Sequence, residues 1–124
     1  MAKVKKENAI GLLVGLRAII GFASWTSPRL AGRVFGLDAE ANPQLPYLVR
    51  LFGVRDVVLA WGALGSEGEA RRQWLLAGFA CDLADAAAGV AGGRSGYLPK
   101  LTSALVSGTA LSGVVLGVAA LSDE

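Results

Sequence analysis

The stretch that decides the fold is LTSALVSGTALSGVVLGVAAL, residues 101–121, which contains no ionisable side chain. A helix that crosses the hydrocarbon core of a bilayer, about 30 Å thick, needs roughly 20 predominantly apolar residues. We therefore predict a transmembrane helix here. The alternative, a soluble helical bundle, would have to bury this segment on all sides, and a chain of 124 residues is too short to supply such a core.

Three further apolar segments precede it, at residues 9–25, 47–65 and 74–91. Each falls within the length range of a membrane span. The whole chain is 53% hydrophobic with a mean hydropathy of +0.50, and only 18% of its residues are charged, whereas soluble proteins have about 25%. The sequence predicts an all-α, four-transmembrane-helix bundle that forms one integral membrane domain over residues 1–124.

The connections between the spans contain helix breakers and polar residues. Ser27 followed by Pro28 is typical of a helix start, and we predict a short helix over residues 28–37. Its apolar residues recur at spacings of four and three, while Arg29 and Arg33 lie on another side, as in a helix that lies in the membrane interface. Residues 65–73 and 92–100 are rich in polar residues and glycine and are predicted to be turns.

The distribution of positive charge predicts the topology. We expect both termini to be cytoplasmic in a bacterial inner (plasma) membrane, with an uncleaved first span because Arg17 interrupts its apolar run. This orientation places five basic residues inside against four outside. The inside set is Lys3, Lys5, Lys6, Arg71 and Arg72, and the outside set is Arg29, Arg33, Arg94 and Lys100.

Several kinds of chemistry are disfavoured by the composition. The chain has no histidine and one cysteine, Cys81, which excludes imidazole-based catalysis, a His-containing or Cys-rich metal site and an intramolecular disulfide. Cys81 lies among small apolar residues and is interpreted as a packed thiol. The scattered basic residues and a net charge of +2 do not indicate nucleic-acid binding. We expect neither an enzyme, a metal nor a cofactor.

Charged residues near the middle of three spans are the most informative feature. They are Arg17 in the first span, Arg55 and Asp56 in the second, and Asp82 and Asp85 in the third. Each isolated charge at the centre of a bilayer costs about 2.5 to 3.5 kcal/mol on insertion scales. These side chains are therefore expected to face inward and to pair with one another.

The spacing predicts the partners. Asp82 and Asp85 are three residues apart and share one helix face, which should take Arg55. Asp56, adjacent to Arg55 and thus pointing about 100° away, should pair with Arg17 instead. Arg50, nearer the end of its span, either completes an electroneutral network or extends to the headgroups.

Two interpretations of this network remain open. It can fix how the helices pack, or it can form a ligand site or proton path, since intramembrane ionisable groups are commonly functional. Small residues at G-x-x-x-G spacing, Gly11/Gly15, Gly89/Gly93 and Gly113/Gly117, indicate close helix packing. A further small-residue stripe on the last span predicts a homo-oligomer or a larger membrane-protein partner; it consists of Ala104, Gly108 and Ser112.

The segments GLRAIIGFASW (15–25), RLFGVRD (50–56) and DLAD (82–85) resemble those of a family of uncharacterised small bacterial four-span membrane proteins. The first span is also similar, more distantly, to that of DoxX-like four-helix membrane proteins, some of which accompany redox or quinone-linked enzymes. The resemblance implies that the arginines and aspartates matter but assigns them no role.

We interpret the chain as a non-enzymatic accessory or assembly subunit of a membrane complex, with a buried Arg/Asp ion-pair network. One alternative is a small dimeric proton-coupled carrier that uses Asp82 or Asp85. The other is a membrane site in which arginines such as Arg50 bind an anionic lipid or small ligand.

Overall fold

The structure, a computed structural model, describes residues 2–122, with side chains from Lys5 onward. Residues 1, 123 and 124 of the predicted domain, and the side chain of Lys3, lie outside the described residues. Within residues 2–122 the chain forms five α-helices and no strand, which confirms the all-α prediction. The helices are α1 (Ala2–Thr26), α2 (Pro28–Val34), α3 (Leu45–Leu64), α4 (Gly68–Ser95) and α5 (Lys100–Leu121).

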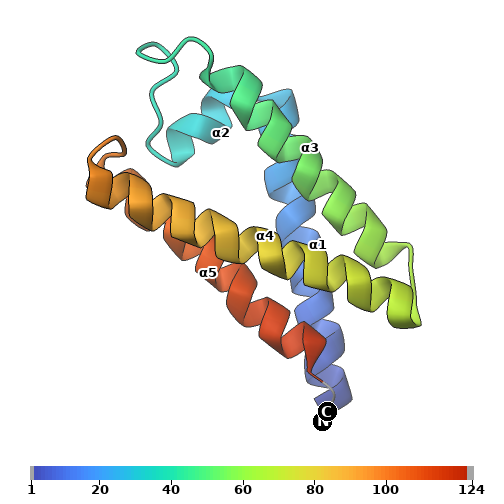
Figure 1. Ribbon diagram of the computed structural model, residues 1–124. Coiled ribbons are helices and arrows are strands. Elements are labelled where there is room, and N and C mark those ends of the chain that lie inside the picture. The colour runs from blue at the N-terminus through green and yellow to red at the C-terminus, as the bar shows by residue number, and fades with distance from the viewer. Residues whose placement is uncertain (1, 123–124) are drawn as a thin grey trace.

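The four long helices form two packed pairs, α1 with α3 and α4 with α5 (Figure 1). The pairs meet at the end of the molecule where α1 begins and α5 ends, through contacts of α1 with α5 and of α3 with α4. A small apolar core joins them there. Its buried members are Ala9, Ile10, Leu13, Ala63, Leu75 and Ala120.

Towards the other end the two pairs diverge. Among residues 2–122, α1 and α4 have no close backbone contact, so any link between them must be made by long side chains. The short helix α2 and the loop after it lie at this end, next to α1 and α3 (Figure 1). The long helices are therefore joined directly at one end, and at the other the loop after α2 bridges the two pairs, because Gly36 packs against the buried Thr102 of α5.

Glycines bring the helices of each pair into close contact. A Cβ atom built on Gly53 of α3 would lie 2.7 Å from the backbone oxygen of Gly21 on α1, and the reverse distance is the same. Neither position can therefore accept a side chain without moving the other helix. The backbones of α1 and α3 are therefore in close contact at this point.

Two of the three predicted G-x-x-x-G pairs also pack inside the molecule. Gly89 and Gly93 of α4 face Ser107 and Ser103 of α5, and Gly113 and Gly117 of α5 face Asp82 and Phe79 of α4. The third pair packs against none of the described residues, because a Cβ atom on Gly11 or Gly15 would meet nothing of them within 4 Å. Gly108 is equally open.

The helix ends differ from the prediction at three places. The helix predicted over residues 28–37 ends at Val34, because Gly36 takes a left-handed conformation (φ 81°) and its N–H donates to the carbonyl of Arg33. The predicted turn 65–73 is mostly the start of α4, whose first residues include the strong helix formers Ala70 and Arg71. The predicted turn 92–100 begins later, since α4 continues to Ser95 before Gly96 ends it.

The outer surface is strongly apolar. Large hydrophobic side chains such as Ile19, Trp61 and Leu101 are about 70% exposed. Three helical segments are long and apolar enough to cross a membrane: Lys5–Thr26, Gly68–Ser95 and Lys100–Leu121. The α3 helix, which covers the predicted second span, is of similar length but contains Arg50, Arg55 and Asp56 within its 20 residues. These features are consistent with an integral membrane protein.

Candidate functional site

The first part of the site is a buried ion pair between α1 and α4. Nη1 and Nη2 of Arg17 donate to the two carboxylate oxygens of Asp82 at 3.2 and 2.7 Å. Both side chains are only 10% exposed. Two glycines make room for them: a Cβ atom on Gly78 would lie 2.7 Å from Arg17 Nη2, and one on Gly113 would meet the Asp82 carboxylate. The pair bridges two helices whose backbones remain apart.

A second ion pair links α3 to the same face of α4. Nη1 and Nη2 of Arg55 donate to the carboxylate of Asp85 at 3.2 and 2.5 Å. Here the side chains are 34% and 31% exposed. The Arg55 guanidinium also lies over the ring of Phe52, with 4.8 Å between its central carbon and the ring centroid.

The observed partners confirm one pairing and correct the other. Arg55 does bind the acidic stripe of α4, at Asp85. The predicted pairing of Asp56 with Arg17 is wrong, because Arg17 binds Asp82 instead. The spacing of Asp82 and Asp85 predicts one acidic stripe for one arginine. In the structure the stripe lies between α1 and α3, so that each carboxylate takes an arginine from a different helix.

Asp56 is thereby left without a full partner. Its nearest cation is its neighbour Arg55, whose Nη2 lies 4.0 Å from Asp56 Oδ1. Arg55 and Asp56 thus make only a marginal ion-pair contact. The distance is too great for a hydrogen bond.

Arg50 lies apart from this network. Its Nε donates to the backbone oxygen of Trp25 at 2.9 Å, near the C-terminal end of α1, and its guanidinium lies 6.0 Å from the Trp25 ring centroid. Arg50 is exposed. Arg50 therefore caps the C-terminal end of α1, where the partial negative charge of the helix favours a cation. It does not pair with the buried aspartates.

The ion pairs border a chamber of about 390 Å³ that lies between the two helix pairs. Arg17, Asp56, Asp82 and Asp85 line it together with apolar side chains from all five helices. The apolar part of the lining includes Leu16, Ile20, Phe52, Leu98 and Val106. Volumes of this order accommodate small organic molecules, and apolar walls with a few convergent polar groups are typical of ligand sites. The sequence did not predict this chamber.

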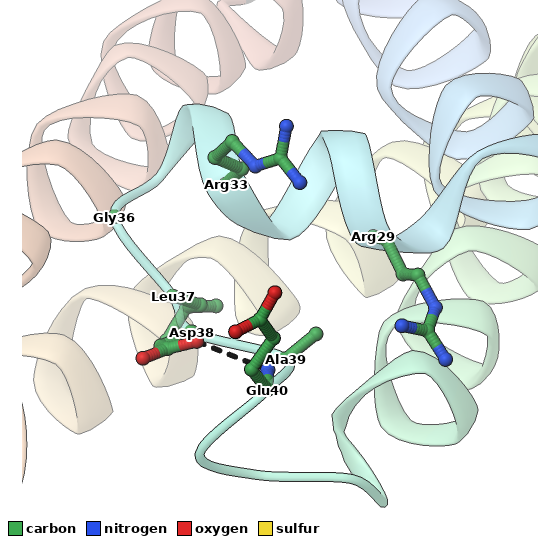
Figure 2. A pocket seen from close by; sticks show the side chains of 7 residues that line it. All are labelled: Arg29, Arg33, Gly36, Leu37, Asp38, Ala39 and Glu40. Carbon is green, nitrogen blue, oxygen red and sulfur yellow. Dashed lines mark hydrogen bonds between the residues drawn. The ribbon is translucent and has the colours of Figure 1, made fainter.

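A smaller pocket of about 290 Å³ lies beside α2. Figure 2 shows Arg29 and Arg33 on α2 and the chain from Gly36 to Glu40 that completes the lining. The Asp38 carboxylate accepts hydrogen bonds from the N–H groups of Glu40 and Ala41 at 3.0 and 3.3 Å, which holds this loop in a turn. The basic and acidic side chains of this pocket are both exposed, so the pocket does not favour a ligand of either charge.

The remaining chemistry is limited. Cys81 is a free, half-buried thiol, in line with its interpretation as a packing residue. No group of three or more acidic or cysteine side chains that could hold a metal ion occurs among the described residues. What the arrangement provides is a preformed apolar space with one incompletely paired carboxylate.

Comparisons with known proteins do not assign the chain to a family. A scan against models of protein families finds no match. A search of curated proteins and a search of solved structures also find none. The fold and the site define a helical protein with three helices able to cross a membrane and a buried Arg17–Asp82 ion pair. The resemblance to four-span and DoxX-like proteins stays a prediction.

Proposed function

We propose that the chain is a four-span protein of the bacterial inner membrane, without enzymatic activity, that binds a small apolar molecule in its chamber. Three spans are supported by the length and hydropathy of α1, α4 and α5. The fourth is α3, whose 20 residues correspond to about 30 Å of helix. Its two inner charges, Arg55 and Asp56, lie at or beside an ion pair and so need not face lipid.

The chamber itself carries this proposal. Its apolar walls suit a lipid-like body, and its polar groups are held on one side by two bidentate ion pairs. A preformed site avoids part of the cost of ordering side chains when a ligand binds. The two pairs, which tie α4 to α1 and α3, therefore give the space a fixed shape.

Ligand retention after mild extraction tests the proposal. Native mass spectrometry of the protein released from its membrane should show a small apolar molecule bound in about one copy per chain. Ala31 lines the chamber from α2, and Ala31→Phe should reduce occupancy because the larger ring occupies the space. Equal occupancy in a correctly folded Ala31→Phe variant, or no ligand in the wild type and no uptake of added long-chain alcohol, would contradict the proposal.

An accessory role in a larger complex is the second candidate. It is favoured by two small-residue surfaces that contact no other helix in the described part of the chain, at Gly11/Gly15 on α1 and at Gly108 on α5. Small residues let another helix approach closely. The same extraction would show a stoichiometric partner or a second copy, and Gly108→Leu should weaken that association. A monomer in both proteins would contradict this candidate.

The carrier hypothesis based on Asp82 or Asp85 gains no support from the geometry. Each of these carboxylates uses both of its oxygens to accept hydrogen bonds from an arginine. Both groups therefore tie α4 to a neighbouring helix, and neither has an oxygen left without a partner.

A further inference from the structure

The position of Asp56 in the chamber wall indicates what kind of molecule the chamber takes. The Asp56 side chain is 7% exposed and lines the chamber. Within residues 5–122 it accepts no hydrogen bond, and its nearest cationic nitrogen is 4.0 Å away. A carboxylate removed from water normally accepts hydrogen bonds from several donors. The oxygens of Asp56 are therefore available to a donor on a bound molecule.

The charges around the chamber do not balance. Two arginines, Arg17 and Arg55, face three carboxylates, Asp56, Asp82 and Asp85, which leaves a formal charge of −1. Arg50, the cation that would have made the group neutral, is bound at Trp25 on the surface. An excess negative charge in an apolar surrounding favours the entry of a cation.

Asp82 and Asp85 are less available to bind a cation. Asp82 and Asp85 each use both oxygens on an arginine, and a ligand would have to displace one of these pairs. Asp56 needs no such displacement. The rest of the lining is mainly apolar, from Leu16 and Ile20 on α1 to Val106 on α5. The site thus combines one available carboxylate with a hydrocarbon-like enclosure.

We propose that the chamber binds a lipophilic amine in its ammonium form, with the N–H groups donating to Asp56 and the apolar body lying against α1, α3 and α5. This inference rests on the proposed function of the chamber as a ligand site and specifies its ligand class. An ammonium group supplies both the missing charge and the missing donor, whereas an alcohol supplies only the donor and a carboxylate repels.

Photolabelling with three matched probes tests the proposal. Decylamine, decanol and decanoic acid, each carrying a terminal diazirine, are incorporated into nanodiscs at equal mole fraction with the full-length protein. Mass spectrometry then quantifies and locates the label. We expect the amine to label chamber residues roughly tenfold more than the alcohol, as for a charge-assisted hydrogen bond in place of a neutral one, and the acid to label least.

Variants separate this inference from the function on which it rests. Asp56→Asn should reduce the amine-to-alcohol ratio to about one while the alcohol still labels the chamber. Asp56→Glu should keep the preference for the amine. Asp38→Asn, which changes a carboxylate in the exposed loop, should behave as the wild type, and Ala31→Phe should lower labelling by all three probes.

The outcomes are distinguishable. If the alcohol labels the wild-type chamber as strongly as the amine does, or if folded Asp56→Asn keeps the preference, the ammonium inference is overturned and the ligand site stands. If no probe labels the chamber above the level in Ala31→Phe, the proposed function itself fails. The comparison of probes on the wild type needs no variant, so it decides the question even where Asp56→Asn does not fold.

Discussion

The two ion pairs on α4 use the same residue types and the same bidentate geometry, but they differ in burial. The side chains of Arg17 and Asp82 are 10% exposed, whereas those of Arg55 and Asp85 are 34% and 31% exposed. The first pair is enclosed by glycines of α4 and α5. We therefore expect the contribution of such a pair to stability to depend on its enclosure, because removing one member of a buried pair leaves an uncompensated charge.

The largest effect should come from breaking the enclosed pair. Asp82→Asn leaves the Arg17 guanidinium buried without a counter-ion, and we expect a loss of about 3 to 5 kcal/mol in the free energy of unfolding. Unfolding in mixed micelles, followed by circular dichroism, measures it. The double variant Arg17→Met with Asp82→Leu should be less destabilised than Asp82→Asn alone. If Asp82→Asn lowers the free energy of unfolding by less than Asp85→Asn does, the enclosed pair is not the more important of the two.

A smaller effect should follow from crowding the same pair. A Cβ atom on Gly113 would meet the Asp82 carboxylate, so Gly113→Ala should displace the aspartate and cost about 1 to 3 kcal/mol, as for other overpacked sites. The matched control is Gly108→Ala on the same helix, where a Cβ meets nothing within 4 Å. Equal thermal midpoints for the two alanine variants would show that Asp82 is not enclosed as described.

The more exposed pair should contribute less. Asp85→Asn removes a pair that is about one-third exposed, and we expect a loss of about 1 kcal/mol, because the freed Arg55 retains access to polar surroundings and stays near Asp56. The same denaturation measurement applies. A loss in the free energy of unfolding as large as that of Asp82→Asn would mean that the Arg55–Asp85 pair is enclosed as fully as the Arg17–Asp82 pair.

The smallest effect is expected at Arg50. It is exposed and bonded to the backbone oxygen of Trp25, so Arg50→Ala should cost no more than about 1 kcal/mol. Because it lies outside the network, its effect should add to that of Asp85→Asn in the double variant. A coupling between the two substitutions would place Arg50 in the network after all.

The sequence was sufficient to predict the helices and the inward direction of the charges. Long apolar segments between Pro- and Gly-rich breaks identify α1, α3, α4 and α5, and the cost of a charge in hydrocarbon predicts that Arg17 and Asp82 are buried. The polar start of α4 was misassigned to a turn, because hydropathy recognises where a span is apolar and not where its helix begins.

The partners of the charges were not predictable in the same way. Whether Arg17 meets Asp56 or Asp82 depends on the rotation and depth of α1 relative to α3 and α4, which no periodicity within one helix determines. The chamber was missed for a related reason. It lies between the two helix pairs, and the way in which one pair sits against the other is not determined by the sequence pattern of any single helix.

The convergence of both pairs on α4 also has a consequence for biosynthesis. The ribosome makes Arg17 and Arg55 well before it makes Asp82 and Asp85. If the first two long helices enter the bilayer as they emerge, Arg17 lies there without its counter-ion, at a cost of about 2.5 to 3.5 kcal/mol, and Arg55 has only its neighbour Asp56, 4.0 Å away. α4 then supplies the bidentate partners of both arginines, so we expect stable integration of the early part of the chain to follow the translation of this third long helix.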